Sequence, residues 1–253
     1  MQNYTLVDAH CHIDFPQFDK DRNEVIERAQ KEGVAVVLSS LNPQDFEKCL
    51  AICEKHDNVF LTVGISPTEE DAHKIDETIE LIKKYGDKIA GIGEVGLDYY
   101  WVGEKEKHEA QKKNFARFIE LSKELDLPLV VHSRNCEADC IEILKRQGKP
   151  AMLHSFSGSV EQAIEAVSFG CIISIPTNIA YSKNKQKIAK EIPLESIVLE
   201  TDAPYLSPVP KTRNEPTNVR VSAGKIGLLR GIDTSIVEKT TTRNAAGFFR
   251  INF

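Results

Sequence analysis

"DRNEVIERAQKEGVAVVLSS", residues 21–40, joins an amphipathic helical segment to a run of apolar, β-branched residues. The helical part ends in a glycine, which is typical of a helix terminus. The run that follows, "VAVVL", is continuously apolar rather than alternating, as expected of a parallel strand covered on both faces. A second amphipathic segment, "QDFEKCLAICEKHD", occupies residues 44–57. A buried parallel strand between two helices indicates an α/β fold.

The same unit recurs along the chain. We expect strands at residues 4–9, 34–40, 58–64, 88–96, 127–133, 150–156, 170–176 and 196–202. Amphipathic segments separate them, the longest at 104–126, and two further helices are expected near 217–230 and 233–250. Eight strands alternating with helices predict a (β/α)₈ TIM barrel, forming a single domain over residues 1–253. A doubly wound open sheet is the structural alternative.

Composition narrows the class of protein. The chain of 253 residues is 41% hydrophobic and 28% charged, as is ordinary for a globular protein. Its net charge of −6 argues against a broad surface that coats nucleic acid but permits a local basic patch. No secretory signal or apolar run of roughly 20 residues is evident. We therefore expect a cytoplasmic protein that does not contact membranes.

The six cysteines give little support to a thiolate metal site. Cys49 and Cys53 are four residues apart, as are Cys136 and Cys140. Structural zinc sites use shorter spacings and a matching second pair. We expect reduced, buried cysteines instead.

Metal-binding residue types follow the predicted strands. In "VDAHCHID", residues 7–14, His10 and His12 would share one face of a strand and suit one divalent ion. Similar residues stand at four other strand ends: Glu94 in "GIGEVGLDYY", His132 in "LVVHSRN", His154 in "AMLHSFSG" and Asp202 in "VLETDAPYL". The carboxyl ends of barrel strands share one face, which carries the active site. Six residues of this kind are therefore expected to converge there.

Each of these residues could instead have a structural role. A single histidine at a strand end is more often a hydrogen-bonded structural residue, but that explanation has to be repeated six times at the same face. His56, His73 and His108 lie in or near helices, where the structural role is favoured. Asp98 could support the site from behind its ligands, whereas Asp139 could lie on a solvated helix face.

The motifs "DAHCHID", "GEVGLDYY", "VVHSR", "LHSFSG", "ETDAPYL" and "RNEPTNV", in this order, resemble those of the TatD-type metal-dependent hydrolases of the amidohydrolase-like superfamily. The resemblance covers nearly the whole chain, including "TTRNAAGFF" near its end. It implies a (β/α)₈ barrel with divalent metal and phosphodiester hydrolysis, as in a deoxyribonuclease of the 3′–5′ exonuclease type. Some relatives deacylate D-aminoacyl-tRNA, which makes a metal-dependent esterase the alternative.

The resemblance also implies roles for the six residues. His10, His12 and Asp202 would hold one metal, His132 and His154 a second, and Glu94 would bridge the two. Two divalent ions can activate water and stabilise both oxygens of an in-line phosphoryl displacement. Mixed nitrogen and oxygen ligands suit Zn or Mn better than Mg. We expect Asp202 to accept the proton of the attacking water.

One motif departs from the family pattern. After the third strand the family usually has Gly-x-His-Pro-His, whereas residues 64–68 read "GISPT". Ser66 and Thr68 thus replace two histidines on the substrate side of the site. A serine hydroxyl can bind phosphate but cannot supply a cationic imidazole. We therefore expect slower turnover of nucleic-acid substrates than in relatives that carry the histidines.

Basic and hydroxyl residues near the strand ends are candidates for substrate contact. The family motifs contain Arg134, Arg213 and Ser157, and Ser66 lies in the variant loop. Further basic residues expected at the rim are Lys183, Lys185, Lys187, Lys211 and Arg220. A positive rim on an acidic protein fits nucleic-acid ends, or aminoacyl-tRNA in the alternative. No obligate protein partner is expected, and a non-catalytic barrel that keeps metal for stability is a third hypothesis.

Overall fold

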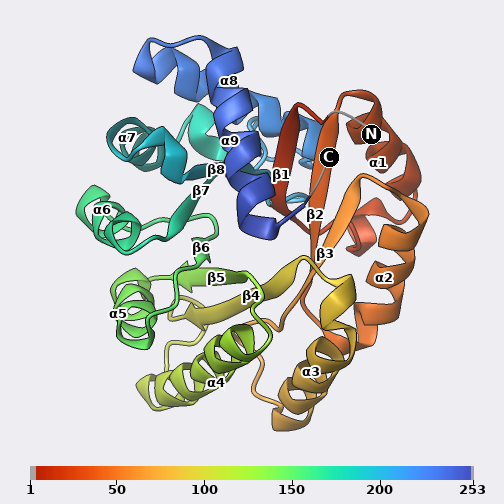
Figure 1. The fold of residues 1–253 in the computed structure, drawn as a ribbon, viewed down its shortest axis with the longest axis vertical. Coiled ribbons are helices and arrows are strands. Elements are labelled where there is room, and N and C mark those ends of the chain that lie inside the picture. Colours follow the sequence, from red (N-terminus) through yellow and green to blue (C-terminus); the bar gives the residue numbers. More distant parts are fainter. Residues whose placement is uncertain (1–3, 252–253) are drawn as a thin grey trace.

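The computed structural model describes residues 4–251, which form eight parallel strands alternating with helices (Figure 1). The strands are β1 (Leu6–Cys11), β2 (Val34–Ser40), β3 (Val59–Val63), β4 (Gly91–Asp98), β5 (Leu129–Arg134), β6 (Met152–Leu153), β7 (Ile172–Pro176) and β8 (Ile197–Glu200). Each strand pairs in parallel with the next, in the order β1 to β8. Sequential order excludes the doubly wound sheet, whose strand order reverses, and confirms the predicted (β/α)₈ barrel.

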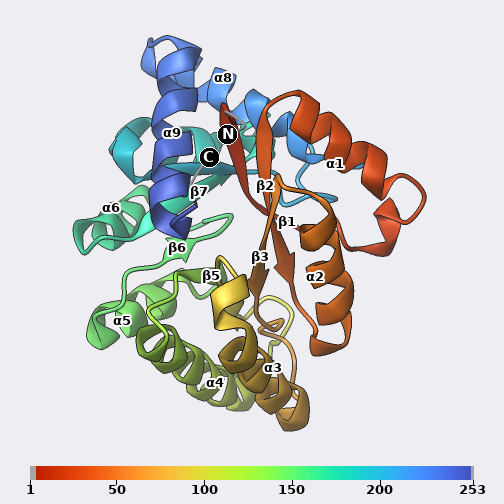
Figure 2. The ribbon, with the colours of Figure 1, turned by 45° about the vertical axis from the view of Figure 1, so that its right-hand side comes forward.

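Helices surround the strands on the outside of the barrel (Figures 1 and 2). They are α1 (Arg22–Lys31), α2 (Phe46–Lys55), α3 (Ala72–Tyr85), α4 (Lys105–Glu124), α5 (Glu137–Gln147), α6 (Val160–Ser168), α7 (Lys183–Glu191), α8 (Val219–Arg230) and α9 (Thr234–Phe249). Short 3₁₀ helices occur in several connections. Within residues 4–251, no helix has both the length and the apolar character needed to cross a bilayer.

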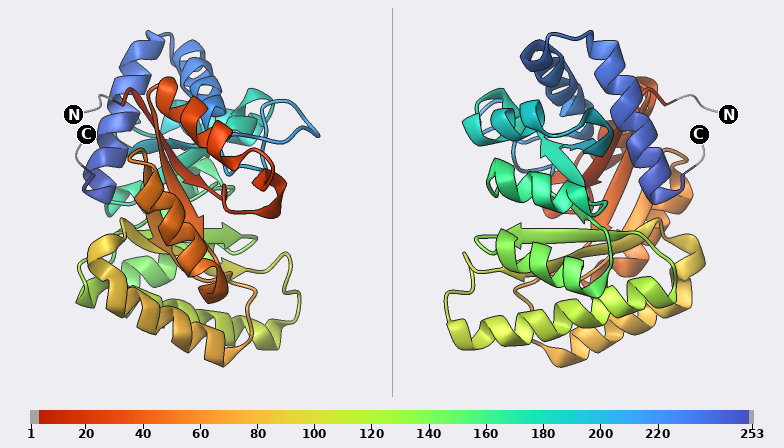
Figure 3. Two further views of the ribbon diagram at one scale, coloured as in Figure 1. Left: turned by 90° about the vertical axis from the view of Figure 1, so that its right-hand side faces the viewer. Right: turned by 60° about the vertical axis from the view of Figure 1, so that its left-hand side comes forward.

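The core has two layers, because alternate residues of each strand face the helices or the barrel interior. The outer layer includes Leu6, Val36 and Leu38 and packs against the helices. The inner layer comprises Val7, Ala9, Ala35, Val37, Val130, Met152 and Val198, together with Ala245 and Phe249 of α9. The helix α9 therefore lies across the N-terminal end of the barrel (Figure 3), where these two side chains join the inner layer. Asn244 fixes the helix there by donating to the backbone oxygens of Leu194 and Ile197.

Two irregular pairings turn functional residues into the barrel. Asp8 and Cys11, three positions apart on β1, pair with β2 residues only two positions apart. Similarly, Ile92 and Val95 on β4 pair with β5 residues two positions apart. Such a bulge inserts one residue and reverses the alternation beyond it. His10 would otherwise face the helices, as Leu6 does.

The seam between β8 and β1 is closed by hydrogen bonds rather than by a regular ladder. The buried carboxylate of Asp8 accepts from the backbone nitrogen and the hydroxyl of Thr201, at 2.7 and 2.5 Å. The backbone nitrogen of Asp202 donates to His10 O at 2.9 Å, and that of His12 donates to Ala203 O at 2.7 Å. These bonds bring the ends of β1 and β8 together at the C-terminal mouth.

Three strands near the site end at other residues than expected. β6 has only two residues, so His154 lies just after it, and Asp202 lies two residues beyond β8. The expectation that Glu94 ends the fourth strand is wrong, because β4 continues to Asp98. Glu94 reaches the mouth from inside the strand, at the bulge.

Gly96 allows β4 and β5 to approach each other closely. Its φ is +143°, and a Cβ there would lie 2.2 Å from the backbone oxygen of His132. We predict that Gly96→Ala lowers the free energy of unfolding by about 3 kcal/mol, because it combines a strained backbone with a backbone clash. Urea denaturation followed by circular dichroism measures the change. Gly103→Ala is the matched control, since a Cβ at Gly103 would have no atom of residues 4–251 within 4 Å beyond its chain neighbours; equal stability of the two variants would contradict the prediction.

Candidate metal centre

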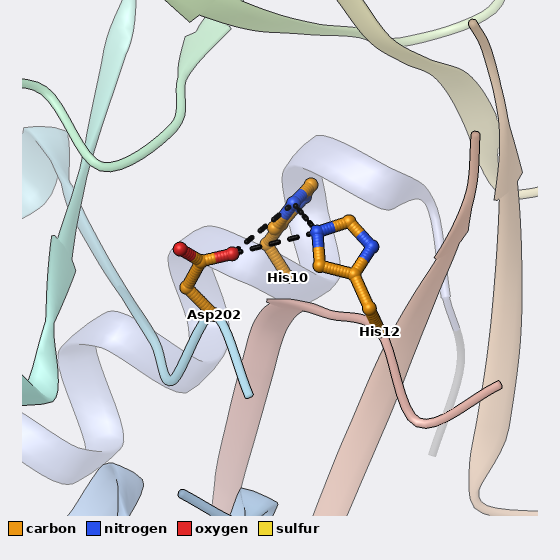
Figure 4. Close-up of side chains that lie close together, drawn as sticks. All are labelled: His10, His12 and Asp202. Carbon is orange, nitrogen blue, oxygen red and sulfur yellow. Dashed lines mark hydrogen bonds and ion pairs between the residues drawn. The ribbon is translucent and has the colours of Figure 1, made fainter. Parts of the chain in front are cut away.

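The structure brings all six candidate metal ligands together inside the mouth of the barrel. His10 lies in β1 and His12 directly follows that strand, and their Nε2 atoms lie 3.3 Å apart. Asp202, in the loop after β8, points its Oδ1 toward both, at 3.4 Å from His12 Nε2 and 3.9 Å from His10 Nε2 (Figure 4). Residues from opposite ends of the sequence thus form one group of three.

Glu94 lies at the centre of the cluster. Its Oε2 is 2.8 Å from His10 Nε2, 3.4 Å from His154 Nε2 and 3.9 Å from His12 Nε2. Its other oxygen, Oε1, is 3.5 Å from His132 Nδ1. A single carboxylate therefore faces four imidazoles from three strand ends. Oε2 has no hydrogen bond of acceptable geometry within residues 4–251, although it is buried.

The backbone at Glu94 is held from both sides. Ser39 of β2 accepts from the Glu94 nitrogen at 3.0 Å and donates to Gly93 O at 3.1 Å. The Ile65 nitrogen, just after β3, donates to Glu94 O at 3.1 Å. The bulged segment is thus fixed by neighbouring strands, which limits the positions available to the Glu94 carboxylate.

The outer nitrogen of three imidazoles faces an acceptor. His12 Nδ1 donates to Ser39 O at 3.1 Å, because a carbonyl oxygen only accepts. His132 Nε2 lies 2.9 Å from Asp98 Oδ2, and His154 Nδ1 lies 3.5 Å from a Glu200 carboxylate oxygen. An acceptor behind a histidine fixes its tautomer and leaves the inner nitrogen with a free lone pair. This arrangement is typical of histidines that bind metal.

Mutual contact sets the charges of the cluster. Burial raises the pKa of Glu94, but the imidazoles of His154 and His10 outweigh it and hold that pKa well below its ordinary value. Burial lowers the pKa of His154, yet Glu94 and Glu200 raise it to about 10. Glu94 is therefore an anion at neutral pH, and protons on His12 and His154, whose pKa values are raised to about 9 and about 10, balance its charge. A divalent cation would release such protons on binding.

The donor atoms fit a divalent ion. Among residues 4–251, two groups have ligand atoms that all lie within 4.8 Å of one another. The first, His10, His12 and Asp202, is the group to which the family resemblance assigns one metal. The second contains His10, Glu94 and His154, and His132 Nδ1 borders it at 3.3 Å from His154 Nε2. Nitrogen and carboxylate donors in this number could hold one or two ions.

The residues expected to contact substrate differ in their exposure and in the partners that their side chains already have. Arg134, at the end of β5, is exposed, and its guanidinium lies over the Tyr100 ring. Ser157 is exposed, and its hydroxyl donates to Ser155 O. The Ser66 hydroxyl is 2.9 Å from that of Thr68 in the loop after β3.

Two basic residues expected at the rim are engaged elsewhere. The Arg213 guanidinium binds both carboxylate oxygens of Asp21 and stacks on Phe18, so its contact with substrate stays a prediction. Lys185 is 3% exposed, and its ammonium donates to Ser157 Oγ at 2.9 Å and to two backbone oxygens of the same loop. The expectation that Lys185 belongs to the exposed rim is wrong, because the β6–α6 loop covers it.

Sequence reasoning missed two residues of the cluster. Glu200 is fully buried, and Ser39 contacts both His12 and the Glu94 backbone. Glu200 could have been predicted from the sequence, since it precedes Asp202 by two residues and would share its face of a strand. A buried serine carries no such signal. All six cysteines are free of disulfides, and only Cys53 is partly exposed, as expected of packing residues.

Asp98 connects to the site through His132. We predict that Asp98→Asn weakens metal binding by about 10- to 100-fold, because an amide nitrogen placed at Oδ2 cannot accept from His132 Nε2. Its Oδ1 would still accept from the two backbone nitrogens that it binds now. Isothermal titration with Zn²⁺ or Mn²⁺ measures the effect. Asp139→Asn, on α5, is the control, and equal affinities of the two variants would contradict the prediction.

The fold and the cluster define a (β/α)₈ barrel whose mouth carries donor atoms that could hold a metal ion, and comparison with known proteins gives the family. A family model described as "TatD related DNase" matches residues 7–250. The chain belongs to this family.

The matches to relatives and to a solved structure extend over nearly the whole chain. Human deoxyribonuclease TATDN3 is 39% identical over 258 residues, covering 96% of this chain and 94% of that protein. The uncharacterized metal-dependent hydrolase MJ1582 of Methanocaldococcus jannaschii is 36% identical, covering 99% of both. The crystal structure of YJJV, a TatD homologue from Escherichia coli K12, matches with a TM-score of 0.90 and 26% identity over 100% of both chains.

Proposed function

We propose that this protein is a metal-dependent deoxyribonuclease of the 3′–5′ exonuclease type, acting on nucleic-acid ends. The observation that carries the proposal is the convergence of four imidazoles and two carboxylates on one point in the barrel mouth. Names of the relatives cited above, deoxyribonuclease and metal-dependent hydrolase, support it. They give no support to the deacylase alternative.

We assign the metal ligands as the family resemblance implies. His10, His12 and Asp202 would hold one ion, and His132 and His154 would hold a second. Glu94 would be shared, in keeping with its place between the imidazoles. Such ions, when bound, lower the pKa of water and stabilise charge on phosphoryl oxygens. Zn or Mn suits these nitrogen-rich donors better than Mg.

Other groups of the chain would handle protons and substrate. Asp202 is an anion in this proposal, since hydrogen bonding to His12 outweighs the effect of burial and lowers its pKa. Its carboxylate would accept the proton of the attacking water and pass it to the leaving oxygen. Arg134, whose guanidinium has no hydrogen bond or ion pair among the described residues, would bind a phosphate. Ser157, Ser66 and Arg213 are kept as further candidates.

The setting of this activity is also part of the proposal. We assign one catalytic domain to residues 1–253, because the eight strands of residues 4–251 form one sheet, whose two end strands are joined by hydrogen bonds at the mouth. The six cysteines without disulfides are consistent with a reducing compartment, and we place the protein in the cytoplasm.

An assay series on one metal-loaded sample tests the function. Release of mononucleotides from the 3′ end of end-labelled single-stranded DNA is the expected result. Release of D-amino acid from D-aminoacyl-tRNA, without DNA hydrolysis, would replace the nuclease by the esterase. A sample that holds metal and hydrolyses neither substrate would contradict both and favour a non-catalytic barrel.

The variant loop after β3 gives a separate prediction. Ser66→His restores one imidazole of the family pattern, and we expect kcat/KM on DNA to rise about tenfold, since hydrogen bonds to charged groups are worth more than neutral ones. Ser66→Ala is the control for loss of the hydroxyl alone. An unchanged kcat/KM for Ser66→His in the exonuclease assay would count against a substrate role of this loop.

A further inference from the structure

Two exposed aromatic residues lie two and three positions after the end of β4. Tyr100 is 53% exposed and Trp101 is 68% exposed. Their ring centroids are 5.0 Å apart and their planes are nearly perpendicular, at 83°. Large aromatic side chains are costly to leave in water, so such exposure near an active site indicates a binding surface.

Arg134 joins these rings from the neighbouring strand. Its guanidinium carbon lies 3.9 Å from the Tyr100 ring centroid and 5.5 Å from that of Trp101. The guanidinium contacts these rings, and its N–H groups have no hydrogen bond or ion pair among residues 4–251. The three side chains therefore combine exposed ring faces with an available cation. We call Tyr100, Trp101 and Arg134 the aromatic platform.

One carboxylate connects the platform to the cluster. Asp98 Oδ1 accepts from the backbone nitrogens of Tyr100 and Trp101, at 2.9 and 2.8 Å. Its Oδ2 is 2.9 Å from His132 Nε2. The platform is thus fixed in position relative to His132. A substrate bound beside His132 would therefore meet the platform in a fixed position, because hydrogen bonds hold this segment.

We propose that the aromatic platform stacks an unpaired nucleobase next to the hydrolysed phosphodiester, while Arg134 binds the adjoining phosphate. The proposal rests on the proposed nuclease function and deepens it. Stacking on aromatic rings and on guanidinium planes is how proteins hold single-stranded nucleic acid without reading its sequence. A base within a duplex has both faces covered by its neighbours. The platform therefore makes the enzyme favour single-stranded or frayed ends over blunt duplex.

Trp101 offers a direct readout, because it is the only tryptophan in the chain. The probe is a short single-stranded oligothymidylate with phosphorothioate linkages, which slow its hydrolysis, added to the metal-loaded protein. We expect quenching of the intrinsic fluorescence as the base stacks on the indole. The same oligonucleotide with abasic residues keeps the phosphates and should leave the fluorescence nearly unchanged. Equal quenching by both, or none by either, would overturn the proposal.

Variants test the contribution to affinity. We expect Trp101→Ala to raise the Kd for the base-bearing oligonucleotide about tenfold, measured by fluorescence anisotropy of labelled DNA. Trp101→Phe keeps a ring and should stay within about threefold of the wild type. The abasic oligonucleotide should bind both variants as it binds the wild type. An unchanged Kd for Trp101→Ala with the base-bearing oligonucleotide would overturn the platform.

The two proposals can fail separately. Base-dependent quenching without DNA hydrolysis would keep the platform and remove the nuclease function. DNA hydrolysis with the same rate on single strands and blunt duplex, and no effect of Trp101→Ala on either, would keep the nuclease function and remove the platform.

Discussion

Replacing Glu94 with glutamine lowers kcat/KM for DNA hydrolysis by about a thousandfold or more, since divalent ions supply several kcal/mol of transition-state stabilisation. The carboxylate is the group that faces all four imidazoles, and it is an anion. A neutral amide of the same shape removes that charge and adds two donors. Exonuclease assays and elemental analysis of the same preparation measure activity and bound metal, and both should fall.

Glu161→Gln makes the same chemical change on α6 and serves as the control, because Glu161 lies in the exposed first turn of that helix. Both variants should keep the circular dichroism spectrum of the wild type. If Glu94→Gln retained full metal content and activity, Glu94 would not be the shared ligand.

Asp202→Asn is expected to lower kcat by about a thousandfold, within the range of positioned general acid–base groups. The amide oxygen can still coordinate an ion, so metal content at saturating metal should fall much less than kcat. The amide cannot accept a proton, which is the step assigned to Asp202. Steady-state kinetics over a metal titration separates the two effects.

Asp139→Asn again provides the control, since Asp139 binds Tyr99 and Lys112 away from the cluster. Recovery of wild-type kcat for Asp202→Asn at high metal concentration would show that Asp202 acts as a ligand only. The proton would then have to go to another group.

The sequence predicts the barrel because its signal is spread over eight strands. Runs such as "VAVVL" in β2 and "LVV" in β5 are buried on both faces, and the helices between them are amphipathic. Strand ends then place His132 and His154 on one face without further information. Short strands are harder to delimit: β6 has two residues, and its extent depends on its pairing with β5 and β7.

The geometry inside the mouth depends on features that a single sequence does not show. Alternation alone would turn His10 toward the helices, and the bulge on β1 reverses it. Similarly, Glu94 sits within β4 and not at its end. The charge of a residue also says little about its partners: Lys185 and Arg213 look like rim cations in the sequence, yet one is buried and the other binds Asp21. Long-range packing decides these outcomes.

The central claim is that the cluster around Glu94 holds the divalent metal on which phosphodiester hydrolysis depends. Elemental analysis and exonuclease activity, measured on one purified sample before and after chelation, test it most directly. We predict bound Zn or Mn, loss of activity when chelation removes it, and recovery in proportion to the metal restored. DNA hydrolysis at an undiminished rate by protein stripped of metal would contradict the claim.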